Sequence, residues 1–206
     1  MAAARINFFE LKNYAKAESY YSQLSQITFS QEDKLEAMRG LLRCQYQLQQ
    51  WSDAAATGKD LVNAKGSSTD DKALSNMAIA KSYQSDGKHD LALANFKTVV
   101  QLNKAALAAE ARYEIANSWF ALNKLSDAEK AAMETINKSG SYDFWVTKSY
   151  ILLGDIYFTQ KDYFNAKATF QSIVDNSINP ELKTEAQSKL TRVIDEESKN
   201  SKVSGQ

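Results

Sequence analysis

The side chains that most often carry out acid–base or nucleophilic chemistry are scarce in this sequence, which contains a single histidine and a single cysteine. His89 lies in the segment DGKHD, between two helical patterns, where a turn residue in contact with solvent is expected. Cys44 lies in the apolar run LLRCQYQL, which predicts a buried and unreactive thiol. Catalysis and metal binding both need several groups that converge, so we expect no enzyme and no metal site.

Other charged and glycine-containing patterns support the same expectation. Asp70 and Asp71 are adjacent acids placed to favour a helix N-terminus, and Glu196 and Glu197 lie near a helix end. No glycine-rich phosphate loop is present, and we expect no cofactor. The 25 basic and 25 acidic residues leave a net charge of zero, without the basic excess that nucleic-acid binding requires. One cysteine cannot form an internal disulfide, and no segment is apolar for long enough to span a membrane.

An alanine recurs along the sequence and marks the repeated elements that would position any binding residues. It follows a short turn at intervals of 37, 38, 36 and 38 residues, at Ala17, Ala54, Ala92, Ala128 and Ala166. A near-constant period of this length is typical of a solenoid of repeated supersecondary units. Seven glycines and one proline are few, and the abundance of Ala, Leu, Lys, Gln and Glu favours helices. The sequence therefore predicts an all-α repeat protein.

The individual repeat is predicted to be a hairpin of two antiparallel helices. In residues 105–140, apolar positions at helical spacing precede the polar turn Asn123-Lys124, and a second amphipathic helix starts near Leu125. A small residue recurs before each turn at Ala80, Ala116 and Gly154, and a bulky aromatic follows it by three positions. Small residues at this place let the two helices approach each other closely.

The pattern consists of a small residue, an aromatic residue three positions later, the alanine after the turn and a second aromatic residue four positions beyond it. This pattern resembles the tetratricopeptide repeat. The resemblance implies an α-solenoid, a right-handed superhelix of about five helix-turn-helix repeats with a C-terminal capping helix. The expected array fills residues 1–199, followed by a disordered tail at 200–206. Its units are 1–29, 31–64, 70–104, 105–140 and 142–178, and the capping helix is 180–199.

Three details of this array are also expected. In the unit around Ala54, Tyr46 precedes the alanine by one residue less than in other units, which predicts a turn shorter by one residue. Asn179 and Pro180 are expected to cap and begin the last helix. The apolar residues near Phe8 do not form the polar face that usually closes a solenoid, so we expect a fragment of a longer array.

The resemblance further implies that the first helices of successive units line a concave groove. Projection of their exposed sides gives a candidate groove that holds apolar residues beside polar and charged ones. Its residues are Met77, Lys81, Gln84, Tyr113, Asn117, Phe120, Lys148, Ile151, Asp155 and Phe158. Some of these side chains could instead pack against the neighbouring hairpin.

The expected function is that of a scaffold that binds a protein or peptide partner in this groove. One alternative is a structural spacer or self-association module of a larger repeat protein, and a more distant one is a carbohydrate-binding module. The repeat spacing is similar to that of tetratricopeptide proteins of bacterial envelopes, which implies a periplasmic or envelope-associated location over a cytoplasmic one.

Overall fold

A computed structural model describes residues 1–27 and 30–203, with the side chains up to residue 200. All secondary structure in this part of the chain is helical, and it forms two compact units, Met1–Ala111 and Arg112–Gln206. The elements are α1 (Ala2–Arg5), the π-helix η1 (Ile6–Glu10), α2 (Tyr14–Ile27), α3 (Gln31–Gln47), α4 (Trp51–Asn63), α5 (Thr69–Ser85), α6 (His89–Leu102), α7 (Ala106–Ala121), α8 (Leu125–Lys138), α9 (Asp143–Thr159), α10 (Tyr163–Asn176) and α11 (Pro180–Val203).

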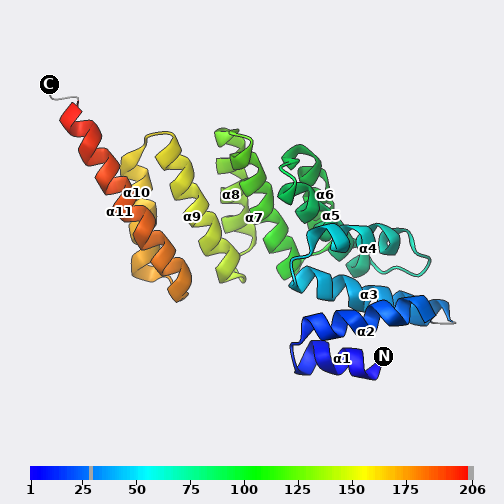
Figure 1. The fold of residues 1–206 in the computed structure, drawn as a ribbon. Coiled ribbons are helices and arrows are strands. Elements are labelled where there is room, and N and C mark those ends of the chain that lie inside the picture. Colours follow the sequence, from blue (N-terminus) through cyan, green and yellow to red (C-terminus); the bar gives the residue numbers. More distant parts are fainter. Residues whose placement is uncertain (28–29, 204–206) are drawn as a thin grey trace. The chain divides into compact units, whose positions relative to one another are not determined.

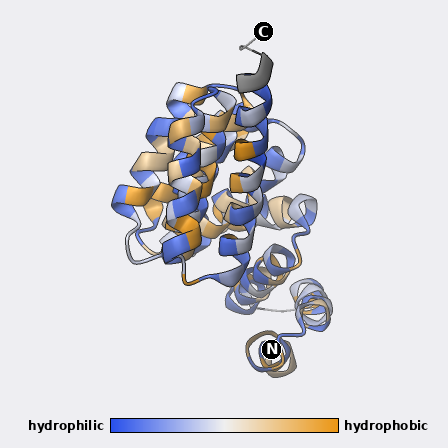
Figure 2. Ribbon diagram, turned by 90° about the vertical axis from the view of Figure 1, so that its left-hand side faces the viewer, coloured by the Kyte–Doolittle hydropathy of each residue, from blue (hydrophilic) through white to orange (hydrophobic). Residues whose placement is uncertain are grey.

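Within each unit, helices pack mainly against their neighbours in sequence (Figure 1). In the first unit the contacts run from α2 through α6, and in the second they run from α8 through α11. Hydrophobic and hydrophilic residues alternate along the helices (Figure 2), and the buried side chains are mostly apolar. The five recurring alanines are all completely buried, as expected for the small residue at each helix crossing.

The turn between the two helices of each hairpin has a constant backbone geometry. A residue in the left-handed conformation lies five positions before the recurring alanine of every unit. The backbone N–H of the following residue donates to the carbonyl five positions earlier in four units, and six positions earlier, to Asn7, in the unit around Ala17, whose first helix ends in the π-helix η1. In the last hairpin the N–H of Asp162 donates to the carbonyl of Tyr157 at 2.9 Å. This arrangement is a Schellman motif, which ends the first helix. The left-handed residues are Lys12, Gln49, Gly87, Asn123 and Lys161.

The unit around Ala54 has the same turn, so the expected shorter turn is wrong. Gln49 is left-handed at the usual offset, and the N–H of Gln50 donates to the carbonyl of Gln45 at 2.9 Å. Gln45, and not Tyr46, therefore occupies the position that Tyr83 holds in the next unit. Its side chain is buried, and its Oε1 accepts a hydrogen bond from the Thr57 hydroxyl at 2.8 Å.

In this unit the large and small residues of the helix crossing are exchanged. Gly154 on α9 faces Phe170 on α10, whereas the equivalent positions in the Ala54 unit are Leu42 on α3 and Gly58 on α4. Leu42 is fully buried. A Cβ atom on Gly58 would lie 3.1 Å from the carbonyl oxygen of Ser75, so glycine here also lets α4 approach α5 closely.

The left-handed turn residues allow a test of the conserved turn geometry. Replacing the exposed Lys161 (φ 63°) with glycine is expected to raise the free energy of unfolding by about 0.5 to 1 kcal/mol, because glycine adopts this conformation without the steric cost of a Cβ atom. Gly87→Ala (φ 73°) is expected to lower it by about 1 to 2 kcal/mol, because a Cβ atom is unfavourable in this conformation. Urea unfolding followed by circular dichroism measures both values, and a stability loss in Lys161→Gly would contradict the assigned turn.

The C-terminal helix begins as expected and continues further than expected. The Asn179 side chain accepts a hydrogen bond from the N–H of Leu182 at 3.0 Å, which confirms it as the N-cap before Pro180. Helix α11 ends at Val203, beyond the expected end of the capping helix at residue 199. Asn200 donates a hydrogen bond to the Tyr163 hydroxyl at 2.8 Å, and this contact holds the last turns of α11 against α10. The rest of the expected tail, residues 204–206, lies outside the described residues.

Candidate functional site

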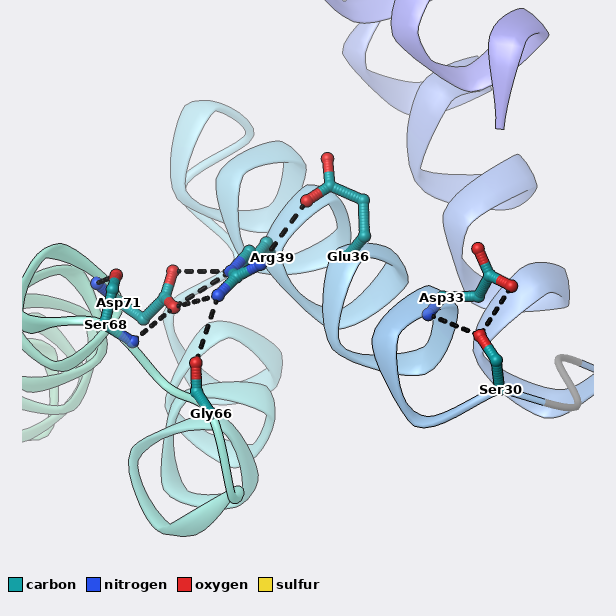
Figure 3. Close-up of polar contacts among 7 residues, drawn as sticks. All are labelled: Ser30, Asp33, Glu36, Arg39, Gly66, Ser68 and Asp71. Atoms are coloured by element: carbon teal, nitrogen blue, oxygen red, sulfur yellow. Dashed lines mark hydrogen bonds and ion pairs between the residues drawn. The ribbon is translucent and has the colours of Figure 1, made fainter.

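An ion pair between a partly exposed arginine and a buried aspartate links the first helices of two successive hairpins in the first unit (Figure 3). Arg39 on α3 donates from Nε to both carboxylate oxygens of Asp71 at 3.0 and 2.9 Å, and its Nη2 lies 2.8 Å from Oδ2. Asp71 is 6% exposed and also closes a capping box with Ser68 at the start of α5. Burial alone would raise the pKa of Asp71, but the hydrogen bonds from Arg39 and Ser68 outweigh it and hold this pKa below its ordinary value.

A second cluster joins α3, α4, α5 and the first turns of α7. The Tyr46 hydroxyl donates to Glu110 Oε1 at 2.8 Å, and Lys81 Nζ lies 3.2 Å from the same oxygen. Lys81 also lies 5.8 Å from the centre of the Trp51 ring, and this ring packs edge-on against Tyr46. Two aromatic rings and one ion pair therefore lie on the same side of the first unit.

The three candidate residues of α5 differ in exposure. Lys81 and Gln84 are partly exposed. Met77 is completely buried because α4 and α6 both pack on α5, so its expected exposure in a groove is wrong. We call the side of the first unit that is formed by these partly exposed residues and the neighbouring cluster the first-unit face. It consists of Tyr46, Trp51, Lys81, Gln84 and Glu110.

In the second unit, α7 and α9 bring aromatic rings together. The rings of Tyr113 and Trp145 lie 5.5 Å apart, and Lys148 Nζ lies 5.7 Å from the centre of the Tyr113 ring. Burial raises the pKa of the Tyr113 hydroxyl above its ordinary value, so this side chain stays neutral. Trp145 was missing from the candidate residues, although it lies three positions before Lys148 on the same face of the helix.

Charged side chains of α11 lie beside these aromatic rings of the second unit. Lys189 Nζ contacts the two carboxylate oxygens of Asp155 at 2.9 and 2.8 Å, and Glu185 lies 3.8 Å from Lys148. Burial raises the pKa of Asp155, and the contacts with Lys189 only partly offset this effect. Arg192 stacks on Phe158 with its Cζ 5.0 Å from the ring centre. Glu185, Lys189 and Arg192 were not among the candidates because they belong to the helix interpreted as a cap.

The remaining candidates of the second unit are placed as follows. Asn117 donates to Glu114 at 3.1 Å and is partly exposed, as are Phe120 and Phe158. Ile151 is only 3% exposed, because it packs in a core cluster with Leu182 and Ala186 of α11. The expectation that Ile151 contributes to an exposed apolar stripe is therefore wrong. The second-unit face consists of Tyr113, Asn117, Phe120, Trp145, Lys148, Asp155, Phe158, Glu185, Lys189 and Arg192.

Reactive and metal-binding groups are as sparse in the structure as in the sequence. Cys44 is completely buried, which confirms that expectation, and burial raises the pKa of its thiol to about 12. Within residues 1–27 and 30–203, histidine, cysteine and acidic side chains form no group that could hold a metal ion. In the same described part, no helix has both the length and the apolar character needed to cross a membrane.

Comparison with known sequence families assigns the repeat. The tetratricopeptide repeat family matches residues 77–143, and a second tetratricopeptide repeat profile matches residues 147–176. The chain belongs to the tetratricopeptide repeat family. The matches span α9 with α10 and the hairpins between Met77 and Asp143, and the constant turn geometry extends the same pattern to the units around Ala17 and Ala54.

Solved structures share the all-α repeat fold. BtubC (BKLC) from P. vanneervenii is 13% identical with a TM-score of 0.65, over 89% of this chain and 81% of that one. TTC0263, a thermophilic tetratricopeptide protein of Thermus thermophilus, is 17% identical with a TM-score of 0.61, over 90% and 95% of the two chains. No curated protein matches the sequence significantly. The expected fold class, an all-α tetratricopeptide solenoid, is confirmed.

Proposed function

We propose that this tetratricopeptide scaffold binds a polypeptide partner on the first-helix faces of its units, with the second-unit face as the main contact surface. The observation that carries the proposal is the arrangement of partly exposed aromatic rings beside ion pairs on that face. Tyr113, Phe120 and Phe158 offer apolar contact area, and Lys148 and Arg192 each lie over an aromatic ring. Aromatic and arginine side chains contribute most to affinity in protein interfaces.

The ion pairs of this face favour a partner that binds through apolar side chains and hydrogen bonds. Lys148 and Lys189 have carboxylates at 3.8 and 2.8 Å, so much of their charge is neutralised within the chain. Asn117 adds an amide that can donate to or accept from a peptide backbone. A segment with an apolar helix face fits this combination of rings and neutralised charges.

Substitutions on the face test the proposal. Phe158→Ala removes an aromatic contact, and Asn117→Arg places a long charged side chain on the face without removing a packed ring. Affinity capture from a lysate of the source organism, with the wild type as bait, identifies bound proteins, and titration of a purified candidate then measures affinity. Each variant is expected to weaken binding by about tenfold or more, because Phe158→Ala truncates an interface anchor and Asn117→Arg places bulk and a charge where the partner would lie.

Phe164→Ala is the matched control, because Phe164 is 76% exposed on the second helix α10 and lies outside the face. Circular dichroism and thermal unfolding confirm that each variant is folded. Wild-type affinity in both face variants would contradict the proposed binding surface, whereas equal losses in Phe164→Ala would show that the effect is not specific to this face.

A further inference from the structure

The cations of the second-unit face differ in whether a carboxylate neutralises them. Lys189 contacts both carboxylate oxygens of Asp155 at 2.9 and 2.8 Å, and Lys148 lies 3.8 Å from Glu185. Arg192 is exposed, and it has no ion pair and donates no hydrogen bond among the residues that the structure describes. Within the described part of this face, Arg192 is therefore the cation that remains available to a ligand.

The ring of Phe158 holds this guanidinium on the side of α11 that faces α9. The Cζ atom of Arg192 lies 5.0 Å from the ring centre. Stacking restricts the long side chain before a ligand arrives, so less conformational freedom is lost on binding. The planar guanidinium presents N–H groups whose spacing matches the two oxygens of a carboxylate. Arg192 thus offers a positioned donor group whose charge is not neutralised within the described chain.

The acidic side chains around Arg192 favour a singly charged ligand. Asp155 and Glu185 belong to the same face, and Asp195 and Glu196 follow Arg192 in the next turn of α11. A phosphate group carries about two negative charges, and these acids would repel it. A carboxylate carries a single charge and can still form two parallel hydrogen bonds with arginine. The local charges therefore favour a carboxylate.

The place of Arg192 on the face sets its distance from the main aromatic contacts. Lys148 lies over the Tyr113 ring, which packs with Trp145, at one end of the face. Phe158 follows Lys148 by ten positions on α9 and lies with Arg192 at the other end. At about 1.5 Å per residue, these two ends are about 15 Å apart. A partner helix that lies along α9 covers this distance in about ten or eleven residues, and residues three turns apart share one helix face.

We propose, on the basis of the proposed function, that the second-unit face binds a helical segment in which an aspartate or glutamate lies about ten or eleven positions from an apolar anchor. The anchor contacts Tyr113 and Trp145, and the acidic side chain accepts two hydrogen bonds from the guanidinium of Arg192. Arg192 thereby discriminates among apolar helices, because a helix without the acid covers the guanidinium and leaves it without a partner.

A displayed peptide library tests which side chains the face selects. The probe is a yeast-displayed library of helical segments of about 16 residues, embedded between two fusion domains so that no terminal carboxylate is present. Binders of the wild-type chain are expected to carry an acid about ten or eleven positions from a large apolar residue. Selection with Arg192→Gln is expected to lose the acid and keep the apolar residue. The matched control Lys183→Gln, which removes an exposed cation of α11 outside the face, is expected to keep both.

A double-mutant cycle then tests the contact itself. The strongest binder is synthesised with an acetyl and an amide end, and its affinity for the full chain is measured by titration. Replacement of its acid by glutamine and the variant Arg192→Gln are each expected to weaken binding by about tenfold or more. Both changes together are expected to weaken it no more than either alone, because each removes the same interaction. Circular dichroism confirms that Arg192→Gln is folded.

The outcomes separate this inference from the proposed function. Binders that are weakened by Phe158→Ala and Asn117→Arg but show no preference for an acid overturn the role of Arg192 and leave the binding face standing. Losses that simply add in the double-mutant cycle also overturn that role, because they exclude a direct contact. A library without binders, or binding that is unchanged in both face variants, overturns the binding face and the role of Arg192 together.

Discussion

Replacing Asp71 with alanine is expected to lower the free energy of unfolding by about 3 kcal/mol, the low end of the range for breaking a buried ion pair. The substitution leaves the Arg39 guanidinium, whose side chain is only 23% exposed, without its main acceptor, and it removes the capping box of α5. The partial exposure of Arg39 lets water recover some of the loss, which places the value at this lower end. Urea unfolding followed by circular dichroism measures the difference from the wild type.

Asp70→Ala is the matched control for this prediction. Asp70 is the adjacent acid in the same first helical turn, but it is exposed and has a 3.4 Å contact with Asn103. Its removal is expected to cost less than about 1 kcal/mol, the usual size of a charge effect at a helix terminus. Equal losses in Asp70→Ala and Asp71→Ala would contradict a specific role for the ion pair with Arg39.

The same ion pair predicts a pH dependence. The pKa of Asp71 is lower in the folded chain than in the unfolded chain, so the unfolded state binds the proton more readily as the pH falls. The stabilisation by the Asp71 carboxylate is therefore complete above the ordinary aspartate pKa of about 3.9 and is lost as the pH falls through the folded-state value. The stability difference between wild type and Asp71→Asn should shrink in this acidic range, and a difference that grows there would contradict the assignment.

The repeat fold could be predicted from the sequence because one small residue must occupy each helix crossing. The alanine period identifies these crossings without any knowledge of long-range contacts. The error in the Ala54 unit arose because Tyr46 was aligned by its aromatic character. The turn is set by the left-handed residue, which is Gln49 here, and a glutamine in that conformation leaves no signal in the sequence.

The candidate site could be predicted only in part, because helical periodicity gives the direction of a side chain and not what covers it. Lys81, Asn117, Lys148 and Phe158 are partly exposed, but packing by neighbouring helices buries Met77 and Ile151. The charges of α11 were missed for a related reason. Their contacts with α9 join residues more than thirty positions apart, and the repeat pattern does not continue into α11.

Gly154→Ala is the second substitution with a large expected effect. A Cβ atom at this position would lie 2.6 Å from two carbon atoms of the Phe170 ring, and this ring is only 1% exposed. We expect a loss of about 1 to 3 kcal/mol in the free energy of unfolding, even though alanine favours a helix over glycine by about 1 kcal/mol. Gly140→Ala is the control, because a Cβ atom there meets no atom within 4 Å and a change below about 0.5 kcal/mol is expected.

A double-mutant cycle separates the clash from a general loss of packing. Phe170→Ala alone is expected to cost about 3 to 5 kcal/mol, because it leaves a cavity at the crossing of α9 and α10. In the double variant the alanine at position 154 enters the vacated space, and the crossing then resembles the pair of Ala116 and Ala132 in the preceding unit, where both residues are fully buried. The two substitutions should therefore couple favourably by about 1 to 3 kcal/mol. Strict additivity in unfolding experiments would contradict direct contact between these positions, and a favourable coupling would show that the small residue at position 154 and the large ring at position 170 fit each other directly.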